Sequence, residues 1–405
     1  MWSTSGRCDR ADREATSRPA GDYLRLGRLA PFYVTSNGQL PSVLARQELA
    51  PEALSFRRWT GSVQAARLWL FAASSGQVVA ALSLDVEADP LGAIPLLEDL
   101  YYVDVQVDGR PLEQLLAAEA PQVVPSVGFE LLPERHQLVF ACAGGEASMP
   151  DDDTLQRMVY RADLPMREGS SSIRYPAELN RRPTTRGALG PYVSVLVGLQ
   201  DYVENAALLS AVLVVAASTR LRQIRDDAYR GVAQLRTSTD HAVPTRQRRL
   251  ALEDMANTLR NLELDLSYSV EAVADLGMLI PALRVESYHE ALIDSMSLDR
   301  RAATTGRMLA RLDNAIDAEL TSVQSVEARA DDARRIRTVA AVTFVTTIAG
   351  MIGLLFAFLG VNAHEVDPAR SMFDGHYLPM YLTIALIAAG GGLIFMVLAW
   401  LERRR

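Results

Sequence analysis

The sequence has few cysteines, and their placement excludes a cysteine-based framework. Only Cys8 and Cys142 occur in a chain of 405 residues. Cys8 lies in a polar segment, and Cys142 follows an apolar run that is typical of a buried strand. We expect neither a disulfide scaffold nor a cysteine metal site. The scarcity of cysteine fits a reducing, cytosolic environment for most of the chain.

The motifs of the common enzyme classes are also missing. No Gly-rich phosphate loop follows a strand, and there is no His-Glu-x-x-His or Gly-x-Ser-x-Gly pattern. His136 and His289 are isolated in the sequence, and we interpret them as solvated or core histidines rather than as ligands. No enzymatic activity is predicted.

An apolar leader and an excess of basic residues are two further absences. Residues 1–20 lack the apolar core of a secretory signal and are predicted to form a disordered tail. Membrane insertion would then depend on internal segments. The formal net charge is -8 and the isoelectric point is near 5.3. Such a balance argues against a nucleic-acid partner, which needs a basic face.

The first domain that the sequence predicts is an α/β cytosolic domain over residues 21–189. Stretches rich in Val, Leu and Tyr predict strands at 77–86, 101–107 and 136–143, and residues 111–120 suit a helix. Loops rich in Gly, Pro and acidic residues separate them.

Residues 190–338 change to long helices and are predicted to form a helical bundle and stalk. The apolar run 207–217 is shorter than the ~20 residues that cross a bilayer, so we interpret it as a buried helix; Arg220, Arg222 and Arg225 follow it. A heptad-like seam comes next, formed by Leu252, Met255, Leu259, Leu262, Leu266, Val270 and Val273.

A third helical run begins near Ser287 and contains no proline before Pro368. Its apolar stripe comprises Leu309, Leu312, Ile316, Leu320, Val323 and Val326. A continuous helix over 300–360 would be roughly 90 Å long at 1.5 Å per residue. Only its last third is apolar enough for a membrane. The remainder would be a cytosolic stalk packed against other helices.

Two segments are long and apolar enough to cross a bilayer, namely 339–360 and 378–401. Arginines precede the first span and follow the second, whereas the connecting loop 361–377 carries a single arginine. The positive-inside rule places both termini in the cytoplasm and the loop outside. The chain is therefore predicted to be an α+β multi-domain membrane protein with a two-span transmembrane domain over 339–405.

The first span carries a stripe of small and weakly polar residues at steps of three or four: Thr343, Thr346, Gly350, Gly353, Ala357 and Gly360. Small residues let helices approach closely in lipid, or they line a lumen along a shared axis. Both interpretations imply association between copies of the chain.

The exit from this span carries the resemblance to a family. Gly360-Val361-Asn362 ends the apolar run, Glu365 and Asp367 follow in the loop, and Glu402-Arg403-Arg404-Arg405 closes the chain. With the α/β domain, the bundle and the stalk, this layout resembles the CorA-type two-transmembrane Gly-Met-Asn channels and transporters of divalent cations. The resemblance covers residues 190–405 well and the first 190 only in class.

The resemblance implies a homo-oligomer, with five subunits expected, in the inner membrane. It implies that Gly360, Val361 and Asn362 form the pore mouth and that Asn362 from each subunit contacts the water shell of Mg²⁺. Mg²⁺ dehydrates reluctantly, which suits a ring of neutral amides. Loop acids would raise the local cation concentration. They are Glu365, Asp367 and Asp374.

Departures from the family leave the transported ion and the activity open. Val361 replaces the usual methionine, so Co²⁺ and Zn²⁺ stand beside Mg²⁺ as candidate ions. The alternative to a channel gated by its cytosolic domain is a CorA-like membrane effector or sensor that responds to a ligand or partner with little constitutive transport. A plain two-span anchor for a helical adaptor is the third hypothesis.

Overall fold

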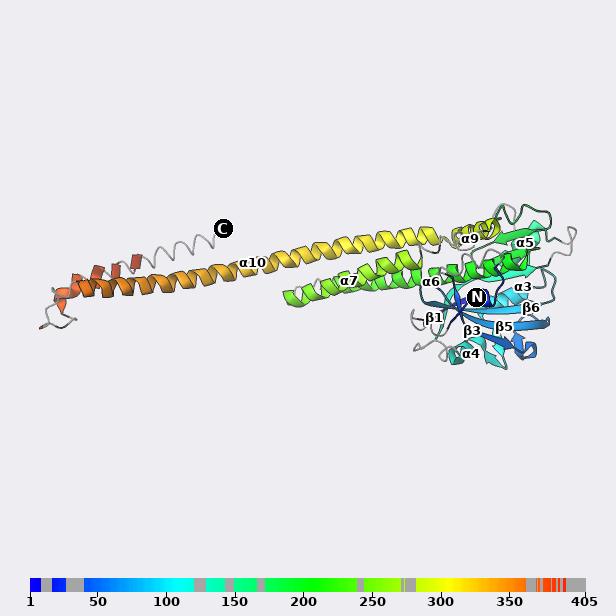
Figure 1. Ribbon diagram of the computed structural model, residues 1–405, viewed down its shortest axis with the longest axis horizontal. Coiled ribbons are helices and arrows are strands. Elements are labelled where there is room, and N and C mark those ends of the chain that lie inside the picture. The colour runs from blue at the N-terminus through cyan, green and yellow to red at the C-terminus, as the bar shows by residue number, and fades with distance from the viewer. Residues whose placement is uncertain are drawn as a thin grey trace. The chain divides into compact units, whose positions relative to one another are not determined.

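The computed structural model describes most of the chain, and its contacts divide it into two units. The described residues are 1–8, 17–26, 40–119, 129–142, 149–165, 172–238, 244–270, 273, 282–361, 369, 371, 374–379, 381–383, 385–386 and 389–390. The first unit comprises Met1–Val243 and Leu250–Asp317. The second comprises Pro244–Arg249 and Ala318–Arg405. The elements of both are shown in Figure 1.

An antiparallel sheet forms the centre of the first unit. Within the described residues it has six strands, in the order β2 (Arg18–Pro19), β3 (Ser42–Leu49), β5 (Val63–Ala72), β6 (Gln77–Val86), β1 (Trp2–Arg7) and β9 (Leu131–Arg135). Each neighbouring pair is antiparallel. The unit is therefore a mixed α+β structure, whose large sheet lacks the parallel pairing of an alternating α/β fold.

Strand β1 corrects one prediction. Residues 1–20 were expected to be a disordered tail, but Trp2–Arg7 pairs with β6 on one side and β9 on the other. The strand is hard to recognise because its sequence, WSTSGR, is mostly polar. Part of that polarity is satisfied within the fold, since the Thr4 hydroxyl donates a hydrogen bond of 2.8 Å to the Val78 carbonyl and the Ser5 hydroxyl accepts one of 2.8 Å from the Glu130 N–H. Tertiary pairing outweighs local composition here.

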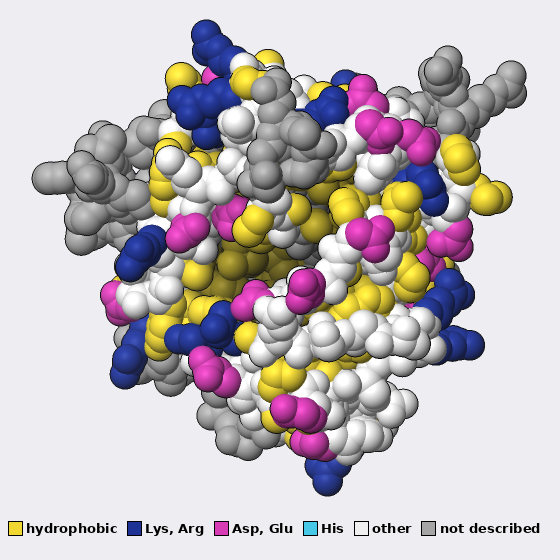
Figure 2. All heavy atoms as spheres, turned by 90° about the vertical axis from the view of Figure 1, so that its right-hand side faces the viewer, with side chains coloured by type: hydrophobic (Ala, Val, Ile, Leu, Met, Phe, Trp, Pro, Cys, Tyr) yellow, Lys and Arg dark blue, Asp and Glu magenta, His cyan; other side chains and the backbone are white. Residues whose placement is uncertain are grey.

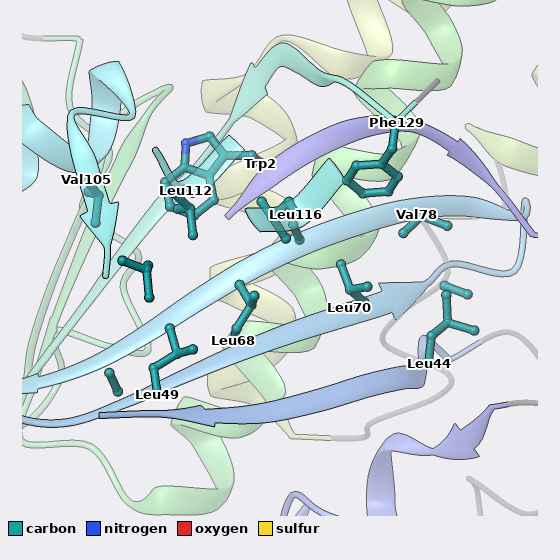
Figure 3. Packing of buried hydrophobic residues seen from close by; sticks show 14 of the residues in the cluster. Trp2, Leu44, Leu49, Leu68, Leu70, Val78, Val105, Leu112, Leu116 and Phe129 are labelled. Carbon is teal, nitrogen blue, oxygen red and sulfur yellow. The ribbon is translucent and has the colours of Figure 1, made fainter. Parts of the chain in front are cut away.

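The apolar core on one side of the sheet joins β1 to distant elements (Figure 3). Trp2 is 2% exposed and belongs to a cluster with Leu68, Leu70 and Val78 from the central strands, together with Leu112 and Leu116 of α4 (Leu112–Glu119). Full burial of a side chain of this size contributes on the order of 2–3 kcal/mol. Burial of Trp2 thus holds the polar strand in place.

Smaller sheets and helices complete the α+β part. In the first, β10 (Gln137–Ala141) runs parallel to β12 (Val193–Val197), which pairs antiparallel with β11 (Arg186–Leu189). The second joins β4 (Leu54–Phe56), β7 (Val105–Val107) and β8 (Arg110–Pro111). Helices α3 (Ile94–Tyr102) and α5 (Asp152–Tyr160) contact each other.

The predicted strands were confirmed unevenly. The prediction over 77–86 coincides with β6, and that over 136–143 contains β10. The prediction over 101–107 was largely wrong, because Tyr101 and Tyr102 finish helix α3 and only 105–107 form a strand. Val103 caps α3 in the left-handed region with φ 61°, so the helix ends with an aromatic pair whose residue type favours a strand.

Long helices follow β12. They are α6 (Asp201–Ser238), α7 (Thr245–Ser269), α9 (Leu283–Ser295) and α10 (Leu298–Val361). The run 207–217 lies within α6 and is buried, apart from half-buried Leu208, as the interpretation of a core helix requires. In the first unit, the heptad positions of α7 are buried except for half-buried Met255, and Leu309, Leu312 and Ile316 of α10 are also buried. The bundle therefore uses the predicted seam and the first half of the predicted stripe. In the second unit, Val323 is buried, Leu320 is half-buried and Val326 is 49% exposed, so the stripe does not stay buried to its end.

The third helical run is broken once near its start. Ser297 adopts a left-handed conformation with φ 53°, which separates α9 from α10. Beyond this break, α10 is a single helix of 64 residues, as the absence of proline predicted.

In the second unit, two ion pairs attach the start of α7 to α10. An Arg248 guanidinium nitrogen lies 2.6 Å from a Glu319 carboxylate oxygen, and one of Arg249 lies 3.0 Å from Glu327.

Candidate functional site

The C-terminal part of α10 has an uncharged surface that no other described residue covers. The segment 339–360 contains no acidic or basic residue. Val339 is 64% exposed, Val345 is 63% exposed and Ile352 is 51% exposed. Apolar side chains in such a continuous exposed run are uncommon in a water-soluble monomer and mark a surface for lipid or for other protein.

Two helices of the described part are long and apolar enough to cross a membrane, and they differ in burial. The apolar window of α6 is 78% buried inside the protein, whereas that of α10 is 0% buried. Helix α6 thus buries most of its apolar surface in the core of the first unit. Within the described residues, nothing buries the apolar window of α10.

The predicted stripe of small residues lies along α10. Thr343, Thr346, Gly350, Gly353 and Ala357 are all exposed, and their steps of three or four keep them on one side of the helix. A Cβ atom added to Gly350 or Gly353 would meet no other atom within 4 Å. No residue in the described part of the chain therefore covers the stripe.

Two threonine hydroxyls on this segment, those of Thr346 and Thr347, bond back to the helix. Thr346 Oγ1 donates to the Val342 carbonyl at 2.8 Å, with Thr343 O at 3.0 Å, and Thr347 Oγ1 donates to Thr343 O at 2.7 Å. Because each hydroxyl has only one proton to donate, its oxygen presents acceptor lone pairs away from the helix. Such oxygens suit the hydrogen-bond donors of water around a cation.

The backbone of α10 extends to the first two residues of the Gly-Val-Asn motif. Gly360 and Val361 are its last residues. Asn362, Glu365 and Asp367 lie outside the described residues, as does His364. Asp374 is exposed, and its carbonyl accepts a hydrogen bond of 3.0 Å from the Tyr377 N–H at the short helix Gly375–Tyr377. The structure therefore describes Asp374 alone among the three loop acids.

The second predicted span is described only in part. Residues 378–379, 381–383, 385–386 and 389–390 are helical, and all of these side chains are exposed. The remainder of 378–401 lies outside the described residues.

Two buried histidines are the other chemistry-bearing groups, and neither is open to solvent. His136 and Ser194 are both 0% exposed, with Nε2 and Oγ 2.7 Å apart. His289 Nδ1 lies 2.7 Å from Ser210 Oγ, and Nε2 lies 2.6 Å from the Val273 carbonyl oxygen. A nucleophile needs access to a substrate, so these pairs are structural. The interpretation of both residues as core histidines is confirmed.

His136 belongs to a chain of hydrogen bonds that fixes its neutral form. The Tyr288 hydroxyl donates to Ser194 Oγ at 3.4 Å, and His136 Nδ1 lies 3.4 Å from the Pro191 carbonyl oxygen. A proton on Nδ1 leaves Nε2 as the acceptor for Ser194. Burial lowers the pKa of His136 from 6.5 to about 3, and burial also lowers the pKa of His289.

These shifts predict a loss of stability in mild acid. The unfolded chain protonates histidine near pH 6.5, whereas folded His136 stays neutral down to about pH 3. The contribution of His136 to the free energy of unfolding is therefore complete above pH 6.5 and declines as the pH falls toward 3. One such histidine costs about 1.4 kcal/mol per pH unit, or about 2 kcal/mol between pH 6.5 and 5. His136→Gln is expected to remove this part of the pH dependence in urea unfolding in mild detergent, followed by tryptophan fluorescence.

The matched control is His376→Gln, which alters an exposed histidine. It should leave the pH dependence of the free energy of unfolding unchanged. Equal pH dependence in His136→Gln and the parent chain would contradict the assignment.

Metal-ligating side chains do not cluster in the described part of the chain. Within it, no group of three or more His, Cys, Asp or Glu residues is placed to hold a metal ion.

Comparison with protein-family models, curated proteins and solved structures finds no match for this chain.

Proposed function

We propose that the protein is a CorA-like homo-oligomeric channel or transporter of divalent cations in the inner membrane, gated by its cytosolic domain. The observation that carries this proposal is helix α10. It begins among the buried helices of the first unit and continues without a break into an uncharged, exposed segment that ends at Gly360 and Val361. The next residue is Asn362.

An uncovered apolar helix with a small-residue stripe supports assembly around a shared axis. Two spans from one chain cannot enclose an ion path, so several copies have to contribute one helix each. The stripe at Thr343, Thr346, Gly350, Gly353 and Ala357 then faces the axis, and the bulkier residues face lipid or the second span. Acceptor oxygens on threonine and a neutral Asn362 bind a hydrated cation without the tight grip of carboxylates.

Mg²⁺, Co²⁺ and Zn²⁺ are the candidate ions, and uptake into proteoliposomes tests them. In the parent protein we expect at least one of these ions to enter faster than into empty vesicles. Asn362→Ala removes the amide ring and should reduce that uptake by about tenfold or more, since a lost ion contact at a selectivity site costs upward of 1.4 kcal/mol.

The control for this substitution is Asn314→Ala. Asn314 lies on α10, and its side-chain amide donates to the Ala310 carbonyl at 2.7 Å. This variant should transport at the parent rate. Parent-level uptake of every ion by Asn362→Ala, or a monomeric protein in mild detergent, would overturn the proposal.

A ligand-responsive effector on the same scaffold is the second candidate. An arginine-lined recess beside Arg301, in the first turn of α10, favours it, because a ligand held there would contact the helix that enters the predicted membrane segment. A protein inert to all three cations until a cytosolic ligand is added would support this function over constitutive transport.

A further inference from the structure

A recess with a volume of about 350 Å³ lies among β9, α6 and the start of α10 in the first unit. Glu134 comes from β9, Arg222 and Arg225 come from α6, and Arg301 comes from α10. Asp226 and Tyr229 also line it. Segments far apart in the sequence thus bring charged side chains of both signs to one place.

The arginines outnumber the acids of the recess, and they differ in how they are paired. Arg222 is the partner of both acids, with an Nη1 to Oε1 distance of 3.2 Å to Glu134 and an Nε to Oδ2 distance of 3.9 Å to Asp226. Three guanidinium groups therefore face two carboxylates, and both carboxylates are engaged by the same one.

The other two arginines are bound to neutral groups. Arg225 Nη2 lies 3.5 Å from the Tyr229 hydroxyl, and its guanidinium carbon lies 5.6 Å from the centre of that ring. Arg301 Nη1 donates to Ser218 Oγ at 3.2 Å. Among the described residues, neither has a carboxylate partner. Guanidinium groups stay charged and bind phosphate through paired N–H donors, so Arg225 and Arg301 leave an anion-binding capacity unused.

Glu134 supplies an independent sign of a missing partner. Its side chain is 9% exposed, and Oε1 accepts a hydrogen bond from Arg222. The second oxygen, Oε2, is buried and accepts no hydrogen bond from any group in the described part of the chain. A largely buried carboxylate with one oxygen that lacks a donor is unfavourable, so a cationic ligand group beside Glu134 would stabilise it.

We propose that this recess binds a small phosphate monoester that carries an amino group. The phosphate oxygens accept hydrogen bonds from Arg225 and Arg301, and the ammonium group lies against the Glu134 carboxylate, which lines the recess. Arg222, held by the two acids, closes the side of the recess between these contacts. The ligand thereby links α6 and the sheet to the first turn of α10. Its effect on ion flow rests on the proposed function, whereas its binding does not.

Titration calorimetry on the full chain in mild detergent tests the site with three probes: phosphoethanolamine, inorganic phosphate and ethanolamine. Phosphoethanolamine should bind saturably and more tightly than inorganic phosphate, and ethanolamine should not bind measurably. Arg301→Gln and Arg225→Gln should each lower the affinity for phosphoethanolamine at least about tenfold, which is the loss expected for one charge-assisted phosphate contact. Glu134→Gln should reduce the affinity for phosphoethanolamine to that for inorganic phosphate.

Arg311→Gln is the matched control, because Arg311 is an exposed arginine on α10 outside the recess. It should bind phosphoethanolamine like the parent, and circular dichroism should show that every variant is folded. Arg225 is exposed, so its variant remains informative if Arg301→Gln does not fold. No saturable binding by the parent, or unchanged binding by both arginine variants, overturns the site. Equal affinity for phosphoethanolamine and phosphate overturns the role of Glu134. If the parent protein bound phosphoethanolamine but took up none of the three cations, the proposed function alone would be overturned.

Discussion

Ile348→Asp is expected to keep the loop 361–377 from reaching the outside of the membrane. Ile348 lies near the middle of the predicted first span and is 39% exposed. A carboxylate at the centre of a membrane helix makes insertion less favourable by about 2.5–3.5 kcal/mol, which changes an equilibrium by roughly a hundredfold. The first unit should stay folded, because Ile348 belongs to the second unit.

Thiol labelling measures this effect. In a Cys142→Ser background, which removes an exposed thiol, Asp374→Cys places a reporter at an exposed loop position. A membrane-impermeant maleimide should label it from outside in the parent and fail to do so after Ile348→Asp. The control Ile336→Asp changes an exposed isoleucine just before the span and should label normally. Outside labelling that persists in Ile348→Asp would show that α10 does not cross the bilayer as predicted.

Val214→Asp should have the opposite outcome, with the membrane segment intact and the first unit unfolded. Val214 lies in the apolar run of α6 and is 0% exposed. An unpaired carboxylate in such a position costs on the order of 3–5 kcal/mol, because burial strips its hydration without a compensating partner. A loss of this size is a large part of the stability of a typical domain.

Urea unfolding followed by tryptophan fluorescence reports this loss, since Trp2 and Trp69 are buried in the same unit. The matched control is Ala233→Asp, an exposed position on α6, where only a helix-propensity cost below about 1 kcal/mol is expected. If Val214→Asp were as stable as the control, the run 207–217 would not be a core segment. Together the two aspartate substitutions distinguish the two apolar helices by their surroundings.

Hydrophobic periodicity predicted the helical part of the fold well. The seam on α7 and the stripe on α10 have the spacing of helices, and in the first unit the α7 positions other than half-buried Met255 are buried, as are Leu309, Leu312 and Ile316 of α10. The absence of proline predicted a continuous α10. Periodicity could not predict the break at Ser297, because a single left-handed residue leaves no mark on a pattern of apolar positions.

Strand β1 shows what local sequence does not contain. Its polar residues gain their place from hydrogen bonds to β6 and from the burial of Trp2 among residues of other elements. The Thr4–Val78 hydrogen bond, for example, joins residues 74 positions apart. No window of neighbouring residues reports them.

The two candidate sites also differ in whether a local sequence pattern predicts them. The stripe on α10 is a local pattern, so Thr343, Thr346, Gly350, Gly353 and Ala357 could be chosen from spacing alone. The recess at Arg301 joins three distant segments, and the sequence showed only that Arg222 and Arg225 follow an apolar run. The isolated Glu134 gave no signal before the sheet placed it beside them.

The unbroken course of α10 restricts how its two ends can communicate. Arg301 and Gly360 both lie on this helix, Arg301 in its first turn and Gly360 next to its last residue. Backbone hydrogen bonds make a helix resist stretching. A conformational change at one end of α10 would therefore reach the other end as a rotation or a tilt of the helix. Any twist at the arginine end would turn the threonines and glycines of the far end about the same axis.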